Sequence, residues 1–234
     1  MLFTEGGFLG TLGTLFTQKI MVITWYGQSC VRLQSKDTAV VFDPYNSSIG
    51  LKLPRLSGDV VCITHDHDDH NNVAAVSGDP FLIETPGEYE VKGIFIYGLS
   101  SFHDDVEGKE RGTNTMYSIE YEGMQITHLG DLGTTKLTDE HLERIEGTDI
   151  LFIPVGGVYT IDAKQAVDVI SQIEPRIIIP IHYRIPKLKY KLDPVDPFLK
   201  AQGVSNGDVI ESFKIQKKDL PQEKTETIIL QSRV

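Results

Sequence analysis

The chain has 234 residues, and its 40% hydrophobic and 24% charged residues are ordinary proportions for a soluble globular protein. A formal net charge of −11, from 33 acidic against 22 basic residues, argues against a nucleic-acid-binding surface spread over the whole protein but leaves a local basic patch open. No apolar run is long enough to span a bilayer, and Cys30 and Cys62 lie outside any C-x-x-C pattern, so we expect buried thiols and a cytoplasmic protein.

Residues 1–20 differ from the rest of the chain, with four glycines, four threonines and almost no charge. No basic segment precedes their apolar part and Glu5 interrupts it, which argues against a secretory signal. We interpret residues 1–20 as an N-terminal extension from an upstream start codon. The open alternative is an extra strand or cap that packs on the fold. Residues 21–234 are expected to form a single domain.

From Met21 onward the pattern of apolar residues predicts strands interleaved with a few helices. Thr138 is expected to cap one helix, with His141 on its surface, and the helix at 162–173 carries an apolar stripe of Ala163, Ala166, Val167, Ile170 and Ile173. A turn is expected at 87–90 and short helices at 73–76 and 197–202. The predicted strands cover residues 22–26, 29–33, 39–42, 60–64, 81–83, 91–97, 115–121, 125–128, 150–154, 177–180 and 227–230. This order fits one layered α/β domain.

The most informative stretch is residues 64–70, T-H-D-H-D-D-H, which follows a short apolar run that we interpret as a buried strand. Three histidines and three aspartates are therefore presented on one loop. Imidazoles and carboxylates are the ligands of zinc and similar metals, and so many carboxylates on one turn repel each other unless a cation compensates. The alternative is a solvated acidic loop that happens to contain histidines.

Three later residues extend this pattern, because His103, Asp131 and His182 each follow a predicted strand end. Read singly, a histidine after a strand is more often hydrogen-bonded than bound to a metal. A layered fold can bring such strand ends to one rim, so the joint occurrence favours a metal site.

The spacing of the loop resembles the H-x-H-x-D-H signature of the metallo-β-lactamase-fold hydrolases. The resemblance implies a four-layer αββα sandwich and two divalent metal ions, with Zn²⁺ as the first candidate and Mn²⁺ or Fe²⁺ as alternatives. It implies that Asp43 supports the metal loop without binding metal and that Asp66 and Asp68 are not ligands. The ligand set that it implies is His65, His67 and His103 for one ion, Asp69, His70 and His182 for the other, and Asp131 between them.

Three further segments, H-L-G-D-L-G, P-V-G-G-V-Y-T-I-D-A and P-I-H-Y, resemble a branch of small stand-alone hydrolases similar to ascorbate-phosphate lactonase and to uncharacterised metal-dependent hydrolases. The resemblance covers Met21 to the C-terminus. It implies that a metal-held hydroxide cleaves an ester, lactone or phosphoester bond in a small anionic metabolite. The alternatives are a phosphodiesterase or nuclease acting on nucleotides or RNA, which the charge balance disfavours, and a non-catalytic metal-binding protein. No membrane partner is expected, and a homo-oligomer remains open.

Two residues are candidates for proton transfer. Asp69 could orient the hydroxide or pass a proton to the leaving group. His128, three residues before Asp131, could serve as a proton shuttle or make a structural hydrogen bond.

The substrate-binding candidates follow the last predicted ligand. Arg184 and Lys187 belong to a basic segment that starts beside His182, so they are expected to attract an anion. Tyr183 and Tyr159 could contact substrate or pack in the interior.

Overall fold

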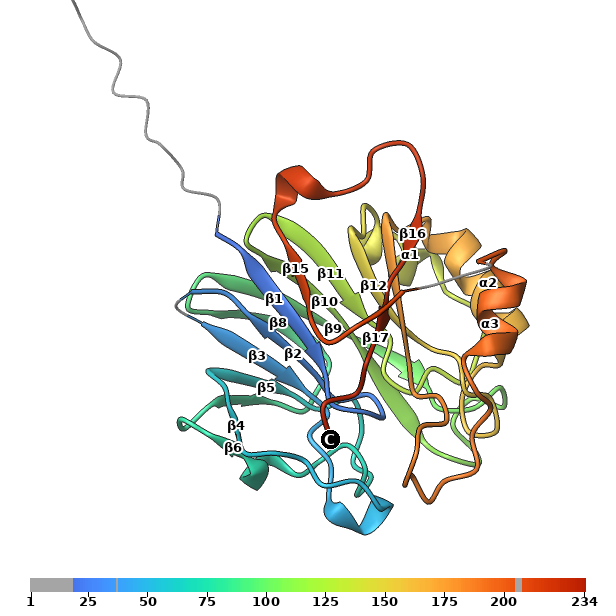
Figure 1. Cartoon of the computed structure of the whole chain (residues 1–234), viewed down its shortest axis with the longest axis horizontal. Helices are drawn as coiled ribbons and strands as arrows, with labels where there is room; N and C mark the ends of the chain where they lie inside the picture. Colours follow the sequence, from blue (N-terminus) through green and yellow to red (C-terminus); the bar gives the residue numbers. More distant parts are fainter. Residues whose placement is uncertain (1–18, 37, 205–207) are drawn as a thin grey trace, which may run out of the picture.

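The computed structural model describes residues 19–36, 38–204 and 208–234. The N-terminal extension proposed from the sequence therefore lies almost entirely outside the described residues. In the described residues, two β-sheets pack face to face (Figure 1). The chain passes from the first sheet to the second after β7 (Phe81–Ile83) and returns to the first sheet for β15.

The first sheet has six strands in the order β15-β1-β2-β3-β5-β7. Its strands β1 and β2 form the hairpin expected from the sequence, and β3, β5 and β7 then run parallel. Every residue of β3 and β5 is buried, as expected of short runs rich in β-branched and other apolar side chains. The bounds are β1 (Met21–Trp25), β2 (Val31–Gln34), β3 (Ala39–Phe42), β5 (Val60–Cys62) and β15 (Phe213–Ile215).

The second sheet has seven strands in the order β16-β13-β12-β11-β10-β9-β8. Its centre is parallel, from β11 to β13, and its β8–β11 end is antiparallel. The bounds are β8 (Gly87–Val91), β9 (Ile94–Phe102), β10 (Thr113–Tyr121), β11 (Met124–His128), β12 (Ile150–Pro154), β13 (Ile177–Ile181) and β16 (Glu226–Thr227). Two short pairs complete the strands: β4 (Leu56–Ser57) with β6 (Val76–Ser77), and β14 (Val209–Ile210) with β17 (Ile229–Leu230).

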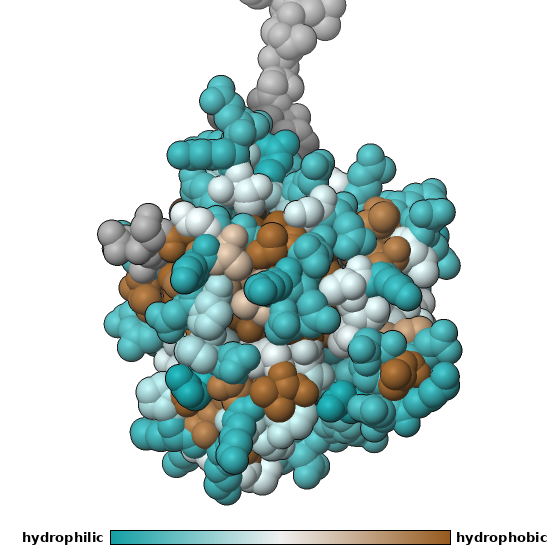
Figure 2. Space-filling model, turned by 90° about the vertical axis from the view of Figure 1, so that its right-hand side faces the viewer, coloured by the Kyte–Doolittle hydropathy of each residue, from teal (hydrophilic) through white to brown (hydrophobic). Residues whose placement is uncertain are grey.

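The helices α1 (Asp139–Ile145), α2 (Ala163–Ile173) and α3 (Asp196–Ala201) lie on the side of the seven-stranded sheet (Figure 1). Thr138 caps α1 as expected, and it forms a capping box with His141. The α/β sandwich expected from the sequence is confirmed. On the face that carries α2 and α3, apolar side chains are scattered among hydrophilic ones (Figure 2). Within the described part of the chain, the helices are all too short or too polar to cross a membrane.

Several local predictions differ from the structure because tertiary pairing decides them. The turn expected at 87–90 is strand β8, which pairs with β9, and the helix expected at 73–76 is a single 3-10 turn, η2 (Val73–Ala75). The strand expected at 227–230 is divided between β16 and β17, which belong to different sheets. The buried face of α2 includes Val169 and not Val167, which the sequence had placed in the apolar stripe. Cys30 and Cys62 are buried free thiols, as expected.

Candidate metal centre

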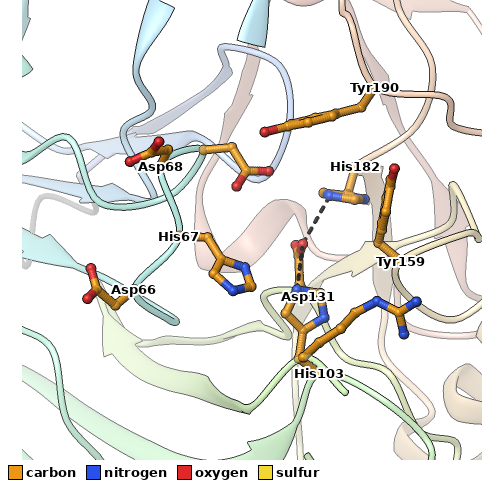
Figure 3. A pocket seen from close by; sticks show the side chains of 10 residues that line it. Asp66, His67, Asp68, His103, Asp131, Tyr159, His182 and Tyr190 are labelled. Atoms are coloured by element: carbon orange, nitrogen blue, oxygen red, sulfur yellow. Dashed lines mark ion pairs between the residues drawn. The ribbon is translucent and has the colours of Figure 1, made fainter. Parts of the chain in front are cut away.

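The sequence positions singled out as metal ligands lie at the ends of four strands. The loop of residues 64–70 follows β5, and His103 comes directly after β9. His182 comes directly after β13, and Asp131 follows β11 by three residues. The structure brings these strand ends together at one rim, where the labelled side chains His67, His103, Asp131 and His182 point into a common space (Figure 3).

Seven side chains at this rim form three overlapping groups. Within each group, the atoms that could bind a metal all lie within 4.8 Å of one another. The groups are His65, His67 and His103; Asp69, His70 and His182; and His65, His70 and Asp131. The first two have the same membership as the two ligand sets implied by the sequence resemblance, and the third joins them through Asp131.

Asp131 lies at the centre of the cluster and is only 2% exposed. Its Oδ2 atom is 3.0 Å from His182 Nε2 and 3.3 Å from His70 Nε2, both of the second group. The same oxygen is 3.6 Å from His103 Nε2, which belongs to the first group. One carboxylate oxygen therefore contacts nitrogen atoms from both sets.

Hydrogen bonds behind the loop fix the orientation of His65, and the Asp43 carboxylate that takes part in them lies close to His70. Asp43, fully buried and in the left-handed region at φ 44°, accepts hydrogen bonds from the Thr64 backbone N–H (2.8 Å) and from the Thr64 hydroxyl (2.9 Å). Because that hydroxyl donates to Asp43, it accepts from His65 Nδ1 (2.9 Å), which leaves His65 Nε2 with a free lone pair. Asp43 Oδ2 also lies 3.1 Å from His70 Nδ1. Carboxylate contacts of this kind orient metal-binding histidines.

The turn between β1 and β2 supplies further support that sequence reasoning missed. The Gln28 side-chain amide donates to Asp69 Oδ2 (2.9 Å) and lies 3.1 Å from His182 Nε2. The Ser29 hydroxyl donates to Asp131 Oδ1 (2.9 Å). Both side chains are fully buried. The only signal in the sequence was a pair of polar residues in a hairpin turn, a place where polar residues are usual.

The chemistry of the cluster fits a bound cation. His65 Nε2 is buried and has no hydrogen-bond partner among the described residues. Burial and the neighbouring His70 lower the pKa of His65 to about 2, so its imidazole is neutral and able to bind a metal. Burial would lower the pKa of His70, but the surrounding carboxylates, Asp131 first, raise it well above its usual value. A positive charge is thus favoured at this point, and a metal ion would supply it.

Two glycines allow the backbone to approach the ligand-bearing segments closely. A Cβ atom on Gly156 would lie 2.1 Å from the carbonyl oxygen of His182. A Cβ atom on Gly133 would lie 2.3 Å from the backbone N of Asp104, next to His103. Any side chain at either position would displace the segment that carries a candidate ligand, which explains one glycine each in the H-L-G-D-L-G and P-V-G-G segments.

The cluster forms the floor of a cavity of about 570 Å³ that opens to solvent (Figure 3). Its lining combines candidate ligands with acidic, basic and aromatic side chains. The lining residues are Asp66, His67, Asp68, Asp69, His103, Arg111, Asp131, Tyr159, His182 and Tyr190. Sequence reasoning singled out neither Arg111 nor Tyr190, because no local motif marks them.

Of the four residues expected to contact substrate, Tyr159 lines this cavity, and Arg184, Lys187 and Tyr183 do not. Arg184 and Lys187 are exposed and lie outside it. Tyr183 is buried, with its ring 4.8 Å from that of Trp25. The segment after His182 places Tyr190 at the cavity instead.

His128 also lies away from the cavity, fully buried between the sheets. Its Nδ1 accepts a hydrogen bond from the Gly130 backbone N–H (3.1 Å), so its Nε2 carries the proton and donates to the Ser29 carbonyl (3.0 Å). Its ring stacks on Phe42 with centroids 4.6 Å apart. With both nitrogens used, the geometry favours the structural alternative over a proton shuttle.

The fold and the cluster together define a class of protein. A profile of the β-lactamase superfamily domain matches residues 22–182, and the chain belongs to that family. It is a metal-dependent hydrolase of the metallo-β-lactamase superfamily.

Particular relatives are similar along nearly the whole chain. A UPF0173 metal-dependent hydrolase from Natranaerobius thermophilus is 29% identical over 228 residues, which cover 85% of this chain and 98% of the relative. A solved structure from Thermotoga maritima, named as a proposed Zn-dependent hydrolase of the metallo-β-lactamase superfamily, is 34% identical with a TM-score of 0.74 and covers 90% of this chain and 98% of that one. The metallo hydrolase Igni18 from Ignicoccus hospitalis, 20% identical with a TM-score of 0.62, shares the fold over 84% of this chain and 99% of its own.

Proposed function

We propose that the protein holds two divalent metal ions, with Zn²⁺ as the first candidate, and hydrolyses an ester, lactone or phosphoester bond in a small anionic metabolite. The observation that carries the proposal is the pair of three-residue ligand groups on either side of the buried Asp131 carboxylate. Histidine-rich sets with one carboxylate suit zinc and neighbouring first-row metals. The Zn-dependent name of the Thermotoga maritima relative points the same way.

In this proposal His65, His67 and His103 hold one ion, and Asp69, His70 and His182 hold the other, with Asp131 shared. Bound divalent ions lower the pKa of a water molecule and polarise a carbonyl or phosphoryl oxygen, which is the chemistry that hydrolysis needs.

The chain's own residues prepare the site for that chemistry. The hydrogen bonds from Asp43 through Thr64 to His65 fix the tautomer in which His65 Nε2 is free. Gln28 holds the Asp69 carboxylate, which also lines the cavity. Asp69 is therefore placed to orient the attacking group or to receive a proton for the leaving group.

The test begins with elemental analysis of protein purified without chelator. We expect close to two first-row metal ions per chain. The metal-assayed protein is then screened against chromogenic esters, lactones, phosphomonoesters and phosphodiesters, with chelator-treated protein as the control. Turnover that persists in the metal-free protein would overturn the proposal, and so would a metal-loaded protein inert toward all these bond types.

A further inference from the structure

The cavity has an unusual charge balance, which points to the residue that recognises the substrate. Four aspartates line it, and Arg111 is the one permanently positive side chain among the described lining residues. If the proposed centre holds two divalent ions, the four carboxylates offset their charge in full. The remaining positive charge of the cavity then comes from Arg111 alone.

Backbone hydrogen bonds hold the loop that carries Arg111. Arg111 lies on the loop between β9 and β10, which begins at the candidate ligand His103. The Asp104 carboxylate accepts hydrogen bonds from four backbone N–H groups of this loop, that of Arg111 at 2.8 Å among them; the other three are those of Val106, Gly108 and Glu110. The His103 backbone N–H donates to the Gly112 carbonyl at 3.1 Å. These hydrogen bonds therefore hold the backbone of Arg111 relative to the metal cluster.

The guanidinium group of Arg111 remains available to a ligand. Its side chain is 33% exposed, and its partner Glu110, 3.5 Å away, is itself 64% exposed. An exposed ion pair of this length contributes little, so an anion in the cavity can replace Glu110 at small cost. The guanidinium fork is suited to a carboxylate or phosphate group.

Tyr159 lies beside this cation, and Tyr190 lies beside Tyr159. The Arg111 guanidinium carbon is 5.9 Å from the centre of the Tyr159 ring, and the Tyr159 and Tyr190 rings are 6.0 Å apart in an edge-to-face arrangement. In the cavity they lie on the side of His182, across from His67 and Asp68 (Figure 3). Tyr159 offers apolar ring surface next to a single positive charge, and Tyr190 extends that surface along the cavity.

We propose that Arg111 binds a carboxylate or phosphate group of the substrate at a distance from the bond that is cleaved. Tyr159 and Tyr190 contact the apolar part of the substrate that connects this anionic group to the cleaved bond. The substrate class is then a small ester or lactone that carries one further anionic group. This inference rests on the proposed dinuclear centre, and it assigns anion recognition to Arg111 in place of the basic segment after His182.

Binding of plain carboxylates tests the inference without turnover. Metal-loaded protein of measured metal content is titrated calorimetrically with dicarboxylates of four to seven carbons and with monocarboxylates of the same lengths. One carboxylate can bind the metals, so only the dicarboxylates can also reach Arg111. We expect the best dicarboxylate to bind the wild-type protein about tenfold more tightly than its monocarboxylate, or more, as for a hydrogen bond to a charged group.

The variants decide which residue is responsible. Arg111→Ala should abolish the preference for the dicarboxylate while leaving metal content and monocarboxylate binding unchanged, and Arg111→Lys should restore part of it, because lysine keeps the charge without the fork. Lys109→Ala is the matched control, since Lys109 lies on the same loop, outside the cavity lining, with a side chain 74% exposed. The Lys109→Ala variant should prefer the dicarboxylate to the same degree as the wild-type protein.

Three results would overturn the inference: no preference in the wild-type protein, a preference that survives Arg111→Ala, or a preference removed by Arg184→Ala. Each of these can occur in protein that holds two metal ions. A protein that holds no metal instead contradicts the proposed function, so the two failures are distinguished by elemental analysis.

Discussion

Replacing Asp43 by asparagine tests whether the hydrogen bonds behind the loop set the metal affinity. Asparagine keeps the size of the side chain and tolerates the left-handed backbone at φ 44°, so the substitution changes charge and hydrogen bonding with little added strain. Its carbonyl can still accept from the Thr64 N–H, now 2.8 Å from the carboxylate. Its NH₂ group, however, would face the Thr64 hydroxyl as a donor.

The Thr64 hydroxyl must then turn its proton toward His65 Nδ1, which it now contacts at 2.9 Å. His65 would carry its own proton on Nε2, the atom proposed to bind metal. The lost hydrogen bond to a buried charge is worth about 1.5–3 kcal/mol. Changes to residues that support ligands typically lower metal affinity about 10–100-fold, which is about 1.4–2.7 kcal/mol and agrees with that range.

The assay is competition for Zn²⁺ against a chromophoric chelator, together with the melting temperature of the metal-loaded protein. Asp79→Asn is the matched control, because Asp79 also has a positive φ, at 53°, but lies exposed on the segment between β6 and β7. The control should bind metal like the wild type. An Asp43→Asn variant whose metal affinity stays within about twofold of the wild type would refute the reasoning, given the size of the expected effect.

Further substitutions test other parts of the site. His67→Ala should lower the metal content by about one ion per chain and Asp131→Ala should lower it more, as measured by elemental analysis; full occupancy in Asp131→Ala would exclude a shared ligand. Gly156→Ala should lower the melting temperature and the metal content together, because its Cβ would lie 2.1 Å from the His182 carbonyl oxygen; a variant with wild-type values in both would show that the backbone adjusts freely. Asp104→Ala should speed hydrogen exchange of the amides in the loop that follows it, and unchanged exchange would show that the carboxylate does not order this loop.

Much of the fold and the candidate ligands could be predicted from the sequence because both depend on local pattern. Short apolar runs rich in β-branched residues, such as β3 and β5, favour buried strands, and both are fully buried. The T-H-D-H-D-D-H loop and the residues that follow β9 and β13 stand out because histidine and aspartate at strand ends are chemically conspicuous. In a layered fold those ends meet at one rim, so residue type and position predicted that these side chains cluster, and the family resemblance supplied their division into two ligand sets.

Tertiary structure alone decided which other side chains reach that cluster. Gln28 lies 154 residues from His182 in the sequence, and only the packing of the two sheets brings their side chains together. Arg111 lines the cavity because the Asp104 carboxylate folds its loop, whereas the more conspicuous Arg184 lies outside. His128, three residues before a candidate ligand in the sequence, is turned into the core. The direction of a loop side chain depends on contacts between distant segments, and no local pattern of residues encodes those contacts.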